Sequence, residues 1–176
     1  MTKEITIKVH LEQVCNDVLA KCNLISKGVR DEALADIRAA VSTPDDDETR
    51  SIICRAITEA IGNVKYIAQR YMTTGRTTDC NQLERLVSSV SEDGAPIYET
   101  IVMTMRIPNF NTSVTDALKS HVHKYVIDYT MYRFLQDLLP EKSGEYKTLA
   151  EDEDYANIGS CLQAREVWTE RRPNFA

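Results

Sequence analysis

The chain has 176 residues, of which 43% are apolar and 27% are charged, and its net charge is −6 with a pI of about 5.1. These proportions exclude an intrinsically disordered chain, and the length fits a single domain, 1–176, that can bury a core. Nucleic-acid and anionic-membrane surfaces need an excess of basic residues. We therefore expect no specific nucleic-acid binding and no membrane partner.

Five cysteines are scattered along the chain without a CxxC pair. This odd, dispersed set argues against a disulfide framework and a zinc site, and favours synthesis in a reducing, intracellular compartment. The N-terminus "MTKEITIKVHLEQV" lacks the basic head and apolar run of a signal peptide. No apolar run approaches the roughly 20 residues of a membrane span.

The first element is predicted to be a short strand, because Ile5, Ile7 and Val9 alternate with polar residues. The apolar period then changes to that of a helix, from Leu11 to about Gly28. A short helical piece is expected over 31–41.

The stretch "STPDDDETRS" predicts the start of a long helix over about 45–72. Thr43 is a suitable cap, Pro44 suits the first helical position, and the acidic run favours the positive end of the helix dipole. The consecutive acids lack the alternate ligand spacing of a calcium loop, so capping is preferred to a cation site.

A β-hairpin is predicted over about 80–107, with "SEDGA" as its turn. The second arm, "PIYETIVMTMRIP", alternates as a strand does. The first arm, "QLERLVSSV", suits a helix as well, and the strand is preferred because the turn and its partner require one.

Two more long helices complete the expected fold, over about 114–139 and 145–171, with "PEKSGE" as the connection between them. Asn111, Thr112 and Ser113 are candidate caps for the first of these helices. The predicted fold class is therefore mainly α with a small β component (α+β), a helical bundle with a β-hairpin and a short N-terminal strand.

Metal binding is not favoured at either cluster of metal-ligating residues. His121 and His123 are two residues apart, which points them about 200° away from each other on a helix, whereas a helical zinc pair needs a spacing of three or four. The acids Glu151 to Asp154 fan out around a helix, as solvated residues do. We predict no metal and no cofactor.

The sequence contains neither a GxSxG nucleophile motif nor a glycine-rich phosphate loop. We therefore predict no catalytic residues and a protein that is not an enzyme, and an enzyme without a recognisable motif is the third hypothesis. Tyr125, Tyr129 and Tyr132 line one side of the helix 114–139. Interleaved cations, which a base-stacking platform needs, are few there, so a core or subunit contact is preferred.

The order of elements resembles that of small proteins encoded in the structural-gene clusters of tailed phages and prophages of gut bacteria. The matching residues are Ile107 to Phe110 in "MRIPNF", then four in the next helix, and finally "RRP" in the tail; the four are His123, Tyr125, Val126 and Phe134. The layout is also similar to that of head–tail connector (adaptor) proteins, which form a ring beneath the portal and carry no catalytic residues. Glu166 and Glu170 partly offset the basic pair here, which argues against a role in gripping DNA.

The resemblance implies a non-enzymatic virion protein of the neck, assembled in the bacterial host cytoplasm. Its implied partners are further copies of itself in a ring, and the portal and tail or neck proteins. The alternative is an intracellular interaction or regulatory module that binds one partner through the face of helix 114–139. The residues predicted to form an assembly interface are Ile101, Met103, Met105, Tyr125, Tyr129, Tyr132, Trp168, Arg171 and Arg172.

Overall fold

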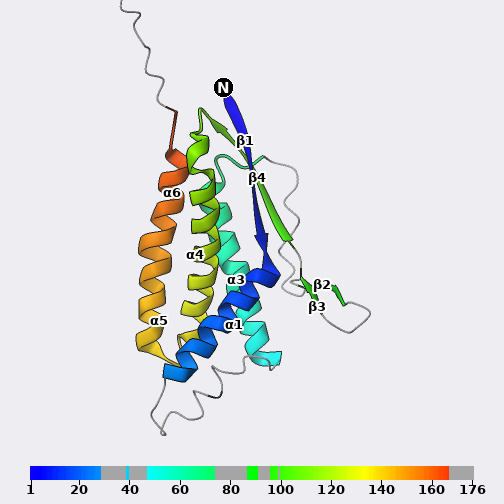
Figure 1. Ribbon diagram of the computed structural model, residues 1–176, viewed down its shortest axis with the longest axis vertical. Helices are drawn as coiled ribbons and strands as arrows, with labels where there is room; N and C mark the ends of the chain where they lie inside the picture. Colours follow the sequence, from blue (N-terminus) through cyan, green and yellow to red (C-terminus); the bar gives the residue numbers. More distant parts are fainter. Residues whose placement is uncertain (29–38, 40–46, 74–86, 91–95, 99, 167–176) are drawn as a thin grey trace, which may run out of the picture.

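The computed structural model describes residues 1–28, 39, 47–73, 87–90, 96–98 and 100–166. In this part of the chain, helices stand side by side and pack against one two-stranded sheet (Figure 1). The predicted fold class, mainly α with a small β component, is confirmed. Several predictions lie outside the described residues: most of the helical piece 31–41, the caps Thr43 and Pro44, and the interface residues Trp168, Arg171 and Arg172.

The sheet joins the N-terminus of the chain to its middle. Strand β1 (Thr2–His10) pairs antiparallel with β4 (Thr100–Pro108), from Thr2 opposite Pro108 to His10 opposite Thr100. Every second side chain points into the core, as the alternation in both segments predicts. The inward residues, all at most 5% exposed, are Ile5, Ile7, Val9, Ile101, Met103, Met105 and Ile107.

The predicted hairpin is correct near its turn and wrong in its extent. Strand β2 (Val87–Val90) pairs with β3 (Pro96–Tyr98), and these two form a second, separate sheet. The predicted second arm, 96–107, is divided, because its longer part pairs with β1. The reason is that β1 offers nine residues with a matching apolar face, so pairing there buries both strands against the helices.

Helix α1 (Leu11–Gly28) confirms the predicted helix. Its buried residues include Leu11, Val14, Val18 and Cys22, whereas Leu19 is 38% exposed. Helix α3 (Asp47–Ala68) ends before the predicted residue 72. The chain leaves the helix there because Met72 forms a bridge to Met105 at the edge of the sheet.

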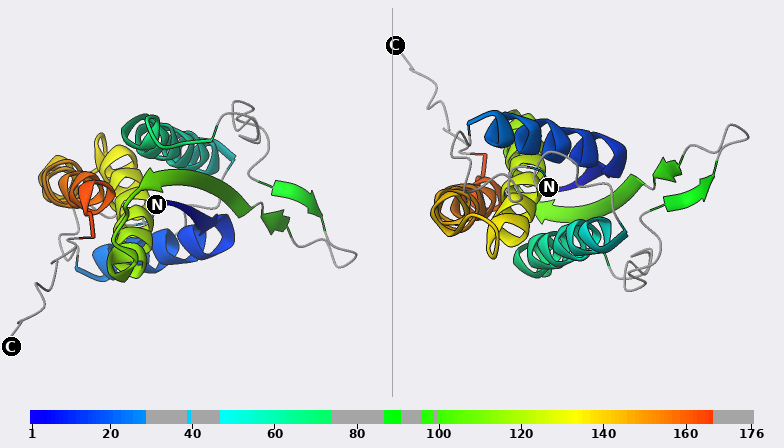
Figure 2. Two further views of the ribbon diagram at one scale, coloured as in Figure 1. Left: turned by 90° about the horizontal axis from the view of Figure 1, so that it is seen from above. Right: turned by 90° about the horizontal axis from the view of Figure 1, so that it is seen from below.

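Helix α4 (Thr115–Leu135) follows a 3-10 turn (Thr112–Val114), which Asn111 caps by accepting from the Ser113 N–H at 3.1 Å. We predicted a helix with one apolar side, but α4 is buried on most of its circumference. Its neighbours are α1, α3, the closing helices and β1, and the view along the bundle shows it among them (Figure 2). It is therefore the central helix of the fold.

The closing helix differs from the predicted 145–171. A continuous helical run consists of α5 (Pro140–Lys147), a π-helical segment η3 (Thr148–Asp154) and α6 (Tyr155–Gln163). The expected connection "PEKSGE" is thus helical, since Pro140 occupies the first turn. The helix ends at Gln163 because Ala164 is extended and Arg165 forms a bridge to Phe110 beyond the end of β4.

Truncating the core side of α3 should destabilise the fold. Ile61 is 2% exposed, so we expect Ile61→Ala to lower the free energy of unfolding by about 3 kcal/mol, through lost burial and a residual cavity. The measurement is urea unfolding followed by circular dichroism. The matched control is Ile52→Ala on the same helix, where the side chain is 41% exposed and the change should stay within about 0.5 kcal/mol. Equal losses from both variants would contradict the packing described for α3.

Candidate functional site

The strand residues predicted for an assembly interface face the interior of this chain. Ile101, Met103 and Met105 are 4%, 1% and 2% exposed and pack in the main core. The prediction that these side chains contact a neighbouring subunit is therefore corrected, because the β1 pairing turns them inward. The outer face of β4 presents exposed residues instead, among them Val102 and Arg106.

The tyrosines form a cluster between helices, which fits the core alternative of the prediction. Tyr125 is 1% exposed, its ring lies 5.7 Å from those of Tyr129 and Tyr155, and Tyr129 lies 5.8 Å from Tyr132. Asn63 donates to the Tyr125 hydroxyl at 3.0 Å. Burial raises the pKa of Tyr125 to about 12. The predicted role in a subunit contact is thus corrected for Tyr125, which holds α3 and α6 to α4.

Tyr129 and Tyr132 remain partly exposed at the rim of this cluster. The Tyr129 hydroxyl donates to Glu59 at 3.4 Å, and Arg133 pairs with the same carboxylate at 3.2 Å. The ammonium of Lys147 lies 5.8 Å from the centre of the Tyr132 ring. These two tyrosines therefore already have partners within the chain.

The two histidines of α4 each contact a carboxylate on a different element. The His123 Nε2 lies 2.9 Å from Asp17 of α1, and the His121 Nδ1 lies 3.0 Å from Asp154 of η3. The predicted divergence of the two rings is confirmed. Each histidine links α4 to a neighbouring helix, so both histidines have a structural role.

One ion pair is largely buried between α1 and α4. Lys21 donates to Asp128, whose side chain is only 8% exposed, while that of Lys21 is 35% exposed. Burial raises the pKa of the Asp128 carboxyl, and Lys21 opposes that rise. The Lys21 ammonium also lies 5.0 Å from the centre of the Tyr146 ring. This pair therefore ties α1, α4 and α5 together.

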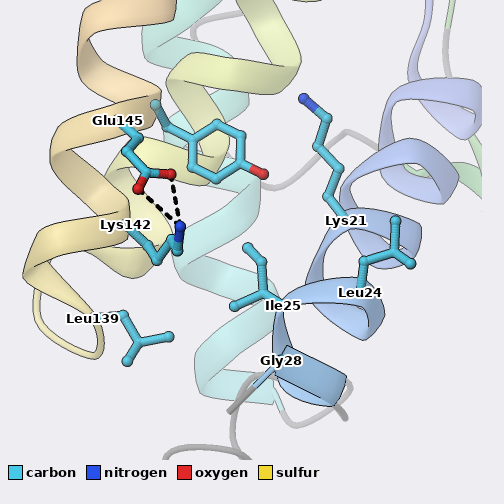
Figure 3. A pocket seen from close by; sticks show the side chains of 8 residues that line it. Lys21, Leu24, Ile25, Gly28, Leu139, Lys142 and Glu145 are labelled. Carbon is cyan, nitrogen blue, oxygen red and sulfur yellow. Dashed lines mark hydrogen bonds and ion pairs between the residues drawn. The ribbon is translucent and has the colours of Figure 1, made fainter.

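An open cavity of about 480 Å³ lies between the end of α1 and the start of α5 (Figure 3). Its walls are mainly apolar, including Leu24, Ile25 and Leu139. Three charged residues line it: Lys142 and Glu145 pair with each other at 2.8 Å, and Lys21 pairs with Asp128. A catalytic pocket needs convergent polar groups that are free to act on a substrate, and these three are engaged in ion pairs.

Within the described ranges, no three His, Cys, Asp or Glu residues are arranged to hold a metal ion. In the same part of the chain, no helix is long and apolar enough to cross a membrane. The polar pairs on α4 join elements of the fold two by two, so they do not converge on one reactive centre.

The main-chain edges of the β1–β4 sheet differ. At the outer edge of β4, the Arg106 N–H donates to the Tyr71 carbonyl at 2.7 Å, and the Thr73 N–H donates to the Thr104 carbonyl at 3.3 Å. Residues 71–73 therefore cover this edge of the sheet. The main-chain groups of the even-numbered residues of β4 therefore point away from β1. Even-numbered residues of β1 lie opposite them in the antiparallel register, so the main-chain groups of Glu4, Thr6 and Lys8 point away from β4. In the described residues no other strand covers this outer edge of β1.

The β2–β3 hairpin is a second exposed strand feature. Figure 2 shows it standing out from the helical body, on the side of β4 away from α5 and α6. Its two strands pair with each other and with no other described strand. The candidate functional surfaces are therefore two strand edges, on the hairpin and on β1.

Comparison with known proteins gives no relative: no family model, no curated protein and no solved structure matches the chain.

The contacts that use Asp17, Lys21, Asp128 and Asp154 were not predicted from the sequence. A signal was present for Asp128, which stands among apolar residues in "YVIDYTMY" where a solvated acid is out of place. The partner Lys21 lies 107 residues away, so only the tertiary structure brings the two together.

Removing the cation of the buried pair should destabilise the protein in a pH-dependent way. We expect Lys21→Met to lower the free energy of unfolding by about 2 kcal/mol at neutral pH, less than the ~3–5 kcal/mol of a fully buried pair because Lys21 is partly solvated. Without Lys21 the Asp128 pKa rises further in the folded state. A carboxyl whose pKa is higher in the folded state than in the unfolded state, where it is near 3.8, stabilises the fold at pH values below 3.8. This stabilisation is lost as the pH rises through the folded-state pKa.

The deficit of Lys21→Met should therefore shrink toward pH 4, as measured by urea unfolding across this range. Asp128→Asn introduced into the same chain removes the unpaired charge and should recover part of the loss at neutral pH. A deficit that stays constant with pH would show that Lys21 acts through packing of its stem instead.

Proposed function

We propose that this protein is a non-enzymatic phage structural protein, a head–tail connector or adaptor ring subunit that joins the portal to the tail. Two things support the proposal: the resemblance in order of elements and motifs from "MRIPNF" to "RRP", and the shape of the chain. The observation that carries most weight is the β2–β3 hairpin, which projects from a closed helical body (Figure 2).

A two-stranded hairpin by itself is only marginally stable in water, and a third strand or a packed face stabilises it. The outer edge of such a hairpin offers main-chain donors and acceptors to another chain. A subunit that places its arm on a different part of its neighbour makes a head-to-tail contact, and repeated contacts of this kind form a ring when the rotation from one subunit to the next closes. The hairpin is thus suited to be the arm of a ring subunit.

The charge of the chain is compatible with a place around a DNA conduit. At a net charge of −6 the protein repels the phosphate backbone, so DNA would pass without being held. The virion neck is accordingly the proposed location.

The alternative, an interaction module that uses the face of helix 114–139, receives less support. α4 is covered by α1, α3 and the closing helices, and ten of its residues are buried: Leu118, Val122, Tyr125, Val126, Ile127, Asp128, Thr130, Met131, Phe134 and Leu135. A partner would have to displace the chain's own core to reach that face.

The first test is peptide mass spectrometry on washed phage particles induced from a strain that carries this gene. We expect the chain at a constant ratio to the portal protein, and that ratio gives its copy number in the ring. Expression in the cells together with absence from washed particles would overturn the proposal.

The hairpin should be required for assembly and dispensable for the fold of the body. Replacing residues 87–98 by a short Gly-Ser linker should leave the unfolding transition of the body near that of the wild type, because β2 and β3 form a sheet of their own and pair with neither strand of the β1–β4 sheet. In a strain complemented with this variant, the chain should disappear from washed particles. Incorporation of the variant at the wild-type ratio would show that the hairpin is not the assembly arm.

A further inference from the structure

The outer edge of β1 carries a self-complementary set of side chains. Glu4, Thr6 and Lys8 are exposed on the outer face of the sheet, and their main-chain groups point away from β4. Glu4 pairs with Arg106 of its own chain at 3.1 Å. Among the described residues Lys8 has no ion-pair partner, and no main-chain hydrogen bond reaches the outward groups of these three residues.

We propose that this edge binds β1 of a second copy of the chain, antiparallel and about a two-fold axis that passes through Thr6. In this register Glu4 lies opposite Lys8 of the second copy, Lys8 opposite Glu4, and Thr6 opposite its own equivalent. The two sheets then become one four-stranded sheet in the order β4, β1, β1, β4.

The main-chain geometry permits this register. All outward groups belong to even-numbered residues of β1, and a two-fold axis through Thr6 pairs even-numbered residues with even-numbered ones. Each such pair exchanges both N–H···O bonds, as hydrogen-bonded pairs of an antiparallel ladder do. The other edge of the sheet is not available for such pairing, since residues 71–73 bond to β4.

The side chains favour this register over the neighbouring registers of the same pairing. A two-fold axis through Glu4 or Lys8 places two like charges directly opposite each other, which destabilises a sheet. An axis through Ile5 or Ile7 places Glu4 opposite a threonine or a histidine. Only the axis through Thr6 gives two opposite-charge pairs and a threonine pair, which are stabilising cross-strand combinations.

The second copy also completes the charges of the outer face. The carboxylate of Glu4 lies between Arg106 of its own chain and Lys8 of the second copy, which supplies the partner that Lys8 lacks. The contact is two-fold and closed, so it does not rest on the proposed ring, whose contacts run head to tail.

Sedimentation equilibrium of the full chain tests the pairing. The wild type should show twice the 20.0 kDa mass of one chain. Lys8→Glu and Glu4→Lys should each weaken dimerisation by about tenfold or more, because each opposes like charges twice. An equimolar mixture of the two variants should dimerise again, since every cross-strand pair is then of opposite charge.

Two controls separate this contact from general effects. Lys27→Glu makes the same change of charge at an exposed position of α1 and should leave the dimer intact. Thr6→Pro removes an outward N–H and should abolish the dimer, whereas Thr6→Val keeps that N–H and should retain it. Circular dichroism checks that each variant is folded.

A wild type that sediments at the mass of one chain at all concentrations would overturn the proposal. So would a Lys8→Glu variant that assembles as the wild type does. The chain in which a linker replaces residues 87–98 should still dimerise, so failure of the β1 contact and failure of the hairpin arm are distinguishable.

Discussion

The pairing of β1 with β4 fixes where the helices pack and which strand residues face the core. It joins the first ten residues to a strand that begins at Thr100, so α1 and α3 belong to the long loop between the two paired strands. Closing such a long loop has an entropic cost, which the seven inward side chains of the two strands offset by burial. The same pairing turns Met103 and Met105 into the core and places α1 and α4 on the same side of the sheet (Figure 1).

Around α4 the fold uses its polar groups as links between helices. His123 reaches α1, His121 reaches η3, and Lys21 reaches across from α1 to Asp128. Asn63 joins α3 to the hydroxyl of Tyr125. Partly buried polar groups that are matched in this way favour one packing over its alternatives, since a displaced helix would leave them unpaired. The central helix is therefore held by specific contacts as well as by apolar burial.

In the part of the chain that the structure describes, both candidate binding surfaces present main-chain groups. The hairpin and the outer edge of β1 are both strand edges, and they lie on different parts of the subunit. Strand edges bind other chains through hydrogen bonds that any sequence can supply, so side chains decide partner and register. On β1 the alternation of Glu4, Thr6 and Lys8 fits a second copy of itself. A closed two-fold contact and a head-to-tail arm can coexist in one assembly, because they use separate surfaces.

Several elements were predictable from the sequence alone: the strand with alternating Ile5, Ile7 and Val9 and the helix that begins at Leu11 are as predicted, and Asn111 caps the 3-10 turn that leads into α4. These are local properties, set by the period of apolar residues and by side chains that bond to nearby main chain. The partners of these elements depend on long-range packing. Strand β4 pairs with β1 rather than with the preceding segment, Tyr125 is buried rather than presented, and the closing helix ends at Gln163 because the next residues pair beside Phe110. Each of these outcomes depends on how much surface is buried between residues that are far apart in the sequence, and a local sequence pattern does not contain that information.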